Sequence, residues 1–466
     1  MTVEEGHIDV GTTSIQLDTT IVVQSTASGA RSVHREVIVL GDPETRAAYT
    51  KIKNTHAENS DYGIVTRPIL PMDSFGRVRV SNPQTIFDSQ LQYDENDLVW
   101  SEKLTGSGTV THDANGSFVD MNVTTASGDA VIRQSPHLRY QPGKSQYITL
   151  TVDFVEAATN CTKTVGYFDD DNGVFLELDG TTVSFVLRSK VSGTVVNTRV
   201  SQSSWNEDVF DGTGRSGVTL DATKSQLVWI DLEWLSVGTV RCGFFHESQP
   251  LLAHAFHNAN TINKSYMATA NLPVRYEITN DAGLSGATKM RQLCSAVMSE
   301  GGFSEDYGFP FTAGNGATTI AVTTRRAILS IRPKATFNSI VNRALILPQG
   351  YGFFPQTNAG FLEVVYNGVL GGAPSWSSVD DDSMVEFDIA GTTVTGGITF
   401  EHAHADAGGI GKNTFSDEKS GDLAARYPLN LDSTGGSPKH LSLVVTSMVV
   451  DSTCAVVGHL NWKEIR

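Results

Sequence analysis

Five consecutive residues, Asp169-Asp170-Asp171-Asn172-Gly173, carry side chains that could bind a cation. Carboxylate and amide oxygens are the ligands that calcium prefers, and a glycine in a calcium loop permits the sharp turn that brings them together. The same residues are also typical of a tight turn between two strands, because Asn-Gly tolerates positive φ. The sequence therefore presents either a metal site or a part of the scaffold at this position.

The residues around the acidic run alternate as in β-strands. Every second residue is Val or Leu in 174–178, and every second residue is again apolar in 183–187. A calcium loop of the EF-hand type needs acidic residues at alternate positions between two helices, whereas these aspartates are consecutive and the flanks are strand-like. The pattern favours a hairpin turn in an antiparallel meander, with a weak cation site as the alternative. The run Asp380-Asp381-Asp382 has the same two interpretations.

Two histidine pairs have spacings that metal sites also use. His402 and His404, followed by Asp406, would project to one face of a strand. A glycine-rich stretch follows directly and no further ligand is identifiable, so we expect solvated loop residues rather than a metal centre. His254 and His257 lie in a strand-like pattern and are expected to pack at a sheet edge. No catalytic, metal-binding or cofactor-binding residue is therefore predicted, and no cofactor is expected.

Aromatic residues near predicted loops could stack on sugar rings or contact a partner protein. Trp376, Tyr351, Phe353 and Phe354 are the candidates for glycan or partner contact. The alternative is that these rings anchor loops in the core or in a neighbouring subunit. Acidic residues are too numerous for the sequence to select a pair suited to glycoside hydrolysis. No regular repeat of a parallel β-helix is visible either, so we expect a protein that is not an enzyme.

The composition favours strands and argues against nucleic-acid binding. Asp and Glu total 51 against 34 Lys and Arg, which gives a net charge of −17, and an acidic surface repels phosphate backbones. Gly is abundant, at 43 residues, and charged residues are only 18% of the chain. No stretch approaches the roughly 20 apolar residues of a membrane span, and the first ten residues do not resemble a secretion signal. The four cysteines lack zinc-type spacing and are expected to be buried free thiols on strands.

The chain divides by pattern into three segments. Residues 1–80 contain two strand-like stretches and one helix candidate over 42–55, where Asp42 can cap the helix and Pro43 suits its first position. Residues 81–303 are a succession of short strands with turn signals at roughly 8–12-residue intervals, as in a sandwich or jelly roll. Residues 304–466 are predicted to form a second β domain. We expect an all-β protein with a small N-terminal attachment segment, a central jelly-roll domain and a C-terminal β-sandwich domain.

The central segment resembles a module in virion structural proteins of tailed bacteriophages and some large algal viruses. The resemblance covers about residues 85–303, and its matching residues are Trp205-Asn206 with Asp208, Asp211-Gly212, Ser216-Gly217, Asp221, Trp234-Leu235 with Gly238, Val240-Arg241, Gly243 and Leu272-Pro273-Val274-Arg275-Tyr276-Glu277. Residues 304–466 are similar, more loosely, to C-terminal β domains of the same kind of proteins through "LSIRPKATFN", "VVYNGVL" and "HLNWKEIR". The family usually has Gly where this chain has Ser236, which puts the conformation of one turn in doubt.

The resemblance implies a concanavalin-like jelly roll, a place on the virion after synthesis in the host cytoplasm, and no known catalytic residues. The expected function is a non-enzymatic structural role in a tailed-phage virion, as a tail or tail-fibre component. Its expected partners are copies of itself, such as in a trimer, and other virion proteins. A head decoration or cement protein, a carbohydrate-binding module that recognises a host surface glycan, and an enzyme acting on polysaccharide are the alternatives. No nucleic-acid partner or membrane span is expected.

Overall fold

The computed structural model describes residues 5–10, 13–26, 29–38, 82–302, 308–409, 411–414, 429–433 and 439–466. It contains two compact units, Met1–Met72 and Asp73–Arg466. Among the described residues every regular element is a strand, apart from the single 3-10 turn η1 (Gln202–Ser204). The all-β prediction is therefore confirmed, while the predicted helix over 42–55 lies outside the described residues.

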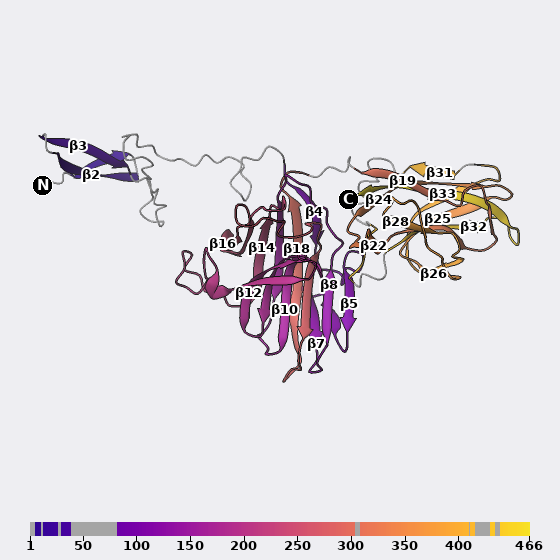
Figure 1. Cartoon of the computed structure of the whole chain (residues 1–466), viewed down its shortest axis with the longest axis horizontal. Helices are drawn as coiled ribbons and strands as arrows, with labels where there is room; N and C mark the ends of the chain where they lie inside the picture. The colour runs from indigo at the N-terminus through magenta and orange to yellow at the C-terminus, as the bar shows by residue number, and fades with distance from the viewer. Residues whose placement is uncertain are drawn as a thin grey trace. The chain divides into compact units, whose positions relative to one another are not determined.

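The described part of the N-terminal unit is a three-stranded antiparallel sheet. Its order follows the chain: β1 (Glu5–Val10), β2 (Thr13–Thr26) and β3 (Gly29–Ile38) (Figure 1). Both strand-like stretches of the sequence thus overlap a strand of the structure. The unit ends at Met72, eight residues before the predicted boundary at 80, and this part of the chain also lies outside the described residues.

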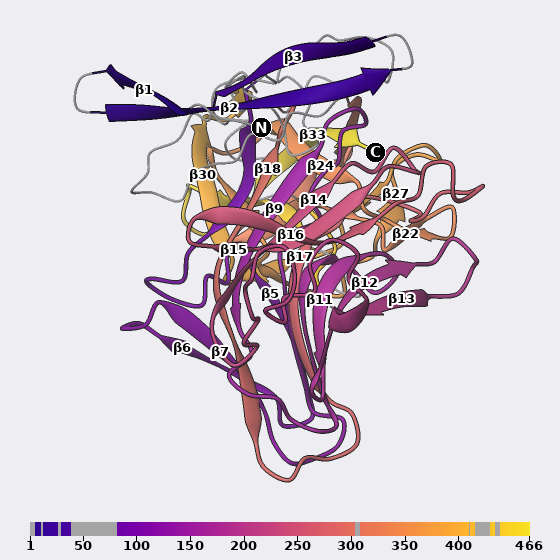
Figure 2. The same cartoon turned by 90° about the vertical axis from the view of Figure 1, so that its left-hand side faces the viewer.

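The central segment forms two antiparallel sheets. The first has the order β13 (Val196–Ser201), β12 (Thr182–Ser189), β11 (Gly173–Asp179), β10 (Cys161–Phe168), β17 (Val274–Asn280), β8 (Ala130–Gln134) and β5 (Ser101–Thr105). The second has the order β16 (Gln249–Phe256), β15 (Val240–His246), β14 (Gln226–Leu232), β9 (Gln146–Asp153), β18 (Thr288–Ser299), β7 (Phe118–Val123) and β6 (Thr109–Asp113), with β4 (Gln84–Ser89) also pairing with β18. Figure 2 shows the β6–β7 hairpin at one side of this jelly roll.

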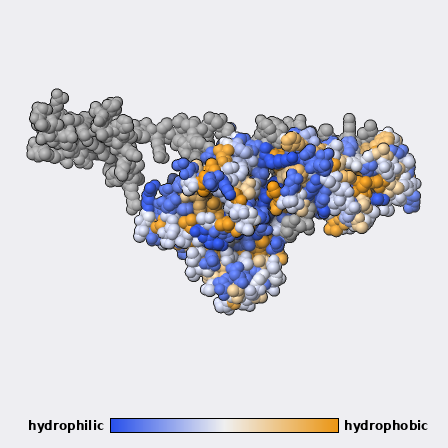
Figure 3. All heavy atoms as spheres, in the orientation of Figure 1, coloured by the Kyte–Doolittle hydropathy of each residue, from blue (hydrophilic) through white to orange (hydrophobic). Residues whose placement is uncertain are grey.

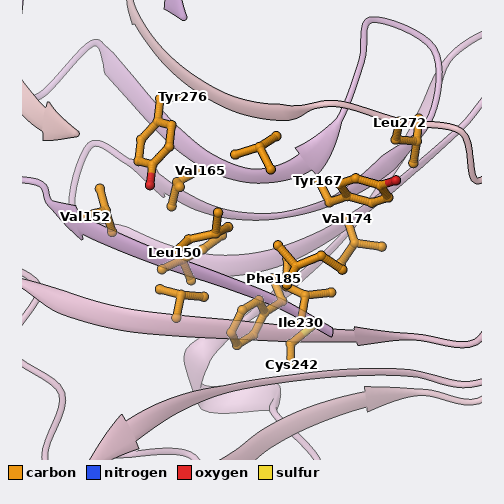
Figure 4. Packing of buried hydrophobic residues seen from close by; sticks show 14 of the residues in the cluster. Leu150, Val152, Val165, Tyr167, Val174, Phe185, Ile230, Cys242, Leu272 and Tyr276 are labelled. Carbon is orange, nitrogen blue, oxygen red and sulfur yellow. The ribbon is translucent and has the colours of Figure 1, made fainter. Parts of the chain in front are cut away.

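The core of the jelly roll lies between these two sheets. Leu176 on β11 lies opposite Phe185 on β12, and both are fully buried in one cluster with residues of the second sheet such as Ile230 (Figure 4). The predicted meander and its inward face are therefore confirmed. Strand β14 is covered on both sides, because Trp229 and Asp231 on its other face are also buried.

The C-terminal segment forms a second, smaller sandwich. One sheet has the order β19 (Phe309–Gly314), β33 (Cys454–Ile465), β24 (Leu345–Pro355) and β31 (Gly411–Thr414), with β20 (Ile320–Val322) also pairing with β33. The other has the order β27 (Ser377–Ser378), β28 (Val385–Asp388), β21 (Arg326–Pro333), β32 (Leu441–Ser447), β25 (Gly360–Tyr366) and β30 (Ile398–Ala405). Two further sheets have two strands each: β22 (Thr336–Phe337) pairs with β23 (Ile340–Val341) in a hairpin, and β26 (Val369–Gly371) pairs with β29 (Thr393–Thr395).

The final strand, β33, is a central strand of its sheet and supplies much of this second core. Trp462 and Leu460 are completely buried between the sheets. Glu464 is equally buried, and its carboxylate accepts hydrogen bonds from Ser383 Oγ at 2.6 Å and from the Met384 amide at 2.8 Å. These bonds fix the segment before β28 to the opposite sheet.

All four cysteines are free and lie on strands, but one of them is exposed. Cys161, Cys242 and Cys454 are buried, and burial raises the pKa of the Cys161 thiol to about 11. Cys294 is exposed where β18 shifts register against β9, so the prediction of four buried thiols is wrong for this residue. Because the thiolate is the reactive form, we expect one rapidly reacting thiol per chain with a disulfide reagent at neutral pH. A Cys294→Ser variant should lose that fast phase; a second fast-reacting thiol would contradict the described burial.

The turn at Ser236 keeps a conformation that favours glycine. Leu235 and Ser236 have φ of 33° and 64°, in the left-handed region. We expect Ser236→Gly to raise the free energy of unfolding by about 0.5 kcal/mol, because relief of strain exceeds the entropic cost of glycine. Ser225→Gly, at a loop position without positive φ, is the control and should slightly destabilise the protein. Urea denaturation of both variants measures the difference, and equal losses of stability would show that Ser236 is unstrained.

Candidate functional site

The acidic run at 169–173 is a hairpin turn between β10 and β11. The Asp169 amide donates to the Asn172 carbonyl at 2.9 Å, and Asp169 Oδ1 accepts hydrogen bonds from the amides of Asp171 and Asn172 at 2.8 Å each. Gly173 has a φ of 142°, and a Cβ at this position would lie 2.3 Å from the Cα of Phe168. The predicted hairpin is therefore confirmed, and Asp169 closes it.

Two of the remaining carboxylate oxygens of this turn, one on Asp169 and one on Asp171, bind an arginine of the C-terminal sandwich. Arg343, two residues before β24, places Nε 2.6 Å from Asp169 Oδ2 and a terminal nitrogen 3.1 Å from Asp171 Oδ2. The side chains of Asp169 and Arg343 are only 7% and 9% exposed. Charge-assisted bonds of this kind are strong and directional when they are buried. The turn that resembled a calcium loop thus holds the two sandwiches together.

Further cations surround the same turn from within the jelly roll. Lys190 lies 2.8 Å from Asp171, and the buried Arg275 on β17 lies 2.6 Å from Asp170 and 2.9 Å from Glu277. Arg188 donates to the Asp169 carbonyl at 3.0 Å. Each aspartate of the run therefore has its own basic partner.

The electrostatics of this junction favour ionised Asp169. Burial on its own would raise the pKa of this carboxyl group, but the neighbouring His137 and Arg343 outweigh burial and hold the pKa well below its usual range. The His137 Nε2 atom lies 3.6 Å from Asp169 Oδ2, beyond hydrogen-bond distance. Asp169 is thus kept ionised both by Arg343 of the C-terminal sandwich and by His137 of the jelly roll.

A second contact between the sandwiches lies near β5. The Ser433 amide donates to Ser101 Oγ at 3.0 Å. Close by in the chain, Glu95, Asp97 and Glu102 bring carboxylate oxygens within 4.8 Å of one another. Arg133 neutralises part of this cluster, since its Nε lies 2.8 Å from Glu102. A group of acidic side chains with a bound arginine does not by itself define a metal site.

The four aromatic candidates do not form one surface. Tyr351 and Phe353 lie on β24 with their rings buried in the C-terminal core, and Phe354 is half-buried. Trp376 is also half-buried, and its described ring contacts are with Arg332, whose guanidinium lies 4.0 Å from the ring centre, and with His440. Two of the rings therefore anchor the core, which is the alternative left open by the sequence. Contact with a glycan or partner stays a prediction for Trp376 and Phe354.

Three of the four histidines lie on edge strands, whereas His257 follows the end of β16 and is exposed, so it does not pack at the sheet edge as predicted. His402 and His404 are exposed on β30, and both rings pack against Phe361, with ring centres 5.2 and 4.9 Å away. They share one face as expected, but on a strand rather than in a loop, because β30 continues to Ala405. His254 is buried on the edge strand β16, as predicted, and burial together with His257 lowers its pKa to about 4.

The second acidic run, Asp380–Asp382, lies in the exposed turn between β27 and β28. The Asp382 amide donates to Asp380 Oδ1 at 2.9 Å, which is again a turn stabilised by its first aspartate. Lys334 and Arg466 donate to backbone carbonyls of this turn. These contacts agree with the turn interpretation of the run.

Sequence reasoning missed Arg343 and His137 as members of the junction. Arg343 is separated from Asp169 by 174 residues in the chain. Neither Arg343 nor His137 belongs to a sequence motif. The one available signal was the surplus of carboxylates in the acidic run, which requires basic partners if the turn is buried. Arg275 did stand among the residues of the family resemblance.

Several residues of that resemblance stabilise the jelly roll. Trp205 packs against Phe185, Phe210 and Phe244 with ring centres 4.9 to 6.2 Å apart. Asp208 accepts hydrogen bonds from the amides of Phe210 and Ser216. These contacts position a loop over the core and assign no chemistry to the residues.

Among known proteins, this chain is similar to solved structures but matches neither a family model nor a curated protein sequence. A protein of unknown function from Shewanella oneidensis has 7% identity and a TM-score of 0.34, covering 48% of this chain and 90% of that one. A putative beta-glucanase from Mycobacterium abscessus has 12% identity and a TM-score of 0.32, covering 46% and 100%. A legume lectin-like domain from Entamoeba histolytica has 8% identity and a TM-score of 0.28, covering 46% and 96%.

Likenesses at this level of identity concern the fold alone and assign no activity or ligand. They cover about half of this chain. In the part of the chain that the structure describes, no helix has the length and apolar character needed to cross a membrane.

Proposed function

We propose that this chain is a non-enzymatic structural protein of a tailed-bacteriophage virion, in the tail or tail fibre, where it contacts copies of itself and other virion proteins. The observation that carries the proposal is the junction of the two sandwiches. Asp169 and Asp171, the best cation ligands in the sequence, bind Arg343 instead, and the two sandwiches belong to one compact unit. A protein that transmits force or spacing between neighbours needs domains fixed in this way.

Exposed apolar residues on the C-terminal sandwich support a role in subunit contacts. Val369, Ile340, Phe309 and Val450 are between 59% and 85% exposed, and they lie on two short strands, at a strand start and in a turn. Figure 3 shows apolar residues gathered in patches between hydrophilic ones on one face. Apolar patches of this kind are typical of protein–protein interfaces. The resemblance over residues 85–303 supplies the choice of a virion as the assembly.

The position in the particle is the direct test of this proposal. Purified virions are digested for mass spectrometry, and intact particles are imaged with an antibody raised against the recombinant chain. We expect the chain in stoichiometric amounts and the antibody on the tail. Labelling of the head surface would favour the alternative of a decoration or cement protein. Absence of the chain from washed particles would contradict a structural role altogether.

Self-association is tested with the purified chain by mass photometry. We expect an oligomer such as a trimer, and a roughly tenfold weaker association for Val450→Asp or Val369→Asp, because a charge replaces a buried apolar contact at the interface. Tyr93→Asp is the matched control, because Tyr93 is 86% exposed on the jelly roll. A monomer at all concentrations, with all variants alike, would remove self-contact from the proposal.

The carbohydrate-binding alternative rests on Trp376, whose ring is half-buried and stacked on Arg332. A glycan array separates the alternatives. Selective binding that is lost in Trp376→Ala and retained in Tyr93→Ala, a change at an exposed aromatic residue of the jelly roll, would favour recognition of a host surface glycan. Incubation with host envelope polysaccharide, followed by a measurement of new reducing ends, tests the enzymatic alternative; new ends would contradict the non-enzymatic proposal.

A further inference from the structure

Strand β13 forms one edge of the first jelly-roll sheet, beside β12 (Figure 2). Among the described strands it pairs only with β12, so its other side presents backbone amide and carbonyl groups to a further strand. Near the end of the strand, the Val200 carbonyl already accepts a hydrogen bond from Trp205 Nε1 at 3.0 Å. The part of β13 that can accept a further strand is therefore residues 196–199, which we call the open edge.

The open edge lacks the features that usually protect a sheet edge, which are proline, an inward-pointing charge, a bulge or a cover. The edge strand β16 of the second sheet contains Pro250, and its pairing with β15 shifts register between Cys242 and Gly243. At the opposite edge of the first sheet, Ser101 on β5 accepts a hydrogen bond from Ser433 of the C-terminal sandwich. Strand β13 itself has no proline and no register shift against β12, and its inner face carries only Val and Thr. An edge of this kind is a template for a strand of another chain.

A pocket of about 520 Å³ lies against the inner face of the open edge. Val196 and Thr198 line it, and Thr198 lies opposite Leu187 on β12, whose side chain belongs to the core. The stretch after β16, which includes Ile262, forms the other wall. Val196 is 50% exposed and Ile262 is 39% exposed, so apolar surface of the pocket is open to solvent. Side chains of an added strand would point alternately into this pocket and away from it, which is how strand addition gains specificity.

The charge of this region restricts the chemistry of the segment that can bind. The chain contains 51 Asp and Glu residues, yet none of them occurs in 180–206 or in 248–276, the two stretches that build the open edge and the pocket. Lys264 lines the pocket and is exposed, and it forms no ion pair with the described acidic residues. Arg199 on the outer face of β13 is half-exposed and lies 2.6 Å from Glu177. Basic residues thus surround an apolar pocket in a chain of net charge −17, which favours an acidic partner.

We propose that the open edge binds an extended acidic segment of another protein, which adds a strand beside β13. Apolar side chains of about the size of valine, at every second position of the segment, enter the pocket. Asp or Glu residues between them lie near Arg199, and a carboxylate at the rim of the pocket lies near Lys264. A second copy of β13 fits less well, because self-pairing would bring the basic residues of two copies together. The inference goes beyond the virion role and does not depend on it, since it concerns a surface of the isolated chain.

Fluorescence anisotropy with the full chain and a labelled Glu-Val-Glu-Val-Glu-Val-Glu peptide tests the proposal. We expect a dissociation constant of about 100 µM at low ionic strength. A Lys-Val-Lys-Val-Lys-Val-Lys peptide should bind roughly tenfold more weakly, because its charge is reversed. An acidic peptide with proline in place of the central valine should also bind roughly tenfold more weakly, because proline lacks an amide donor for the strand ladder.

Variants at exposed positions locate the binding site without disturbing the core. Val196→Asp places a carboxylate in the pocket and should weaken binding of the acidic peptide roughly tenfold or more. Leu104→Asp is the matched control, because Leu104 is 51% exposed on β5, at the other edge of the same sheet. Lys264→Glu should weaken binding roughly fivefold, whereas Lys224→Glu, at an exposed position outside the pocket, should leave it unchanged.

Three results would overturn the proposal: no binding of the acidic peptide, equal binding of the acidic and the basic peptide, or unchanged binding in Val196→Asp. Mass photometry of the same variant examines the other occupant. Loss of an oligomer in Val196→Asp, together with no binding of the acidic peptide to the native chain, would assign the open edge to a second copy and overturn the choice of partner. None of these results depends on where the chain lies in a particle, so the virion proposal is tested separately.

Discussion

Replacing Arg343 with Ala should uncouple the two sandwiches and cost about 3–5 kcal/mol, the range for removing one partner of a buried ion pair. The reason is that Asp169 and Arg343 are 7% and 9% exposed, so the variant leaves a buried carboxylate without its strongest partner. Calorimetry should show the thermal transition of the Asp73–Arg466 unit split into two, one for each sandwich. Lys190→Ala is the control. Lys190 binds the same turn through Asp171 but is 44% exposed, so its loss should cost under about 1 kcal/mol.

The acid sensitivity of the same variant should change in a defined direction. In the native protein the pKa of Asp169 is lowered, so its contribution is complete above the unfolded pKa of about 3.9 and is lost as pH falls through the folded value. Without Arg343 the folded pKa rises towards the ordinary value, and acid unfolding should begin at a higher pH. Asp169→Asn combined with Arg343→Ala closes a double-mutant cycle. A single transition, an unshifted acid midpoint and no coupling energy would show that the junction is not held by this pair.

Lys163→Met should destabilise the jelly roll by about 4 kcal/mol, because an amine that joins its two sheets is lost. Lys163 is 1% exposed on β10, and its Nζ atom lies 2.7 Å from the carbonyls of both Phe154 and Glu156. On β18, in the opposite sheet, it reaches the Lys289 carbonyl at 2.8 Å and Thr288 Oγ1 at 3.1 Å. Methionine fills the same space but donates to none of these acceptors.

The matched control for this variant is Lys289→Met. The side chain of Lys289 is 35% exposed and bonded to Asp120, and its loss should cost less than about 1 kcal/mol. Urea denaturation followed by tryptophan fluorescence measures both variants. Near-equal urea midpoints for the two variants would contradict the prediction. They would mean that the free energy lost by desolvating the Lys163 ammonium group equals the free energy gained from its four hydrogen bonds.

Individual strands were predictable from the sequence wherever apolar and polar residues alternate within the strand itself. The alternation of apolar residues in 174–178 predicted a strand with one inward face, and Leu176 on that face is buried in the core. Strand order was not predictable in this way. β17 lies between β10 and β8, and β18 lies between β9 and β7, because long-range pairing rather than local pattern decides which strands become neighbours.

The site was less predictable, because its partners are distant and its local signals are mixed. Tyr351 and Phe353 seemed to lie in a loop because glycines and prolines surround them, yet β24 runs from Leu345 to Pro355 and absorbs Pro348 with a shift in register. Arg343 has no neighbouring residues that mark it as a ligand of the acidic turn. Local sequence indicates where charge is concentrated, but only the folded chain pairs that charge.

In each sandwich, strands that are synthesised last occupy central positions in the sheets, which affects how the protein folds during synthesis on the ribosome. β17 and β18 complete the two jelly-roll sheets from the middle, and β33 joins β19, β20 and β24. A nascent chain that stops before residue 454 would therefore leave β24 with an open hydrogen-bonding edge. A nonsense codon at position 462, close to the end of β33, would already remove Trp462 and Glu464 from the interior. Products that lack β33 should then aggregate or be degraded.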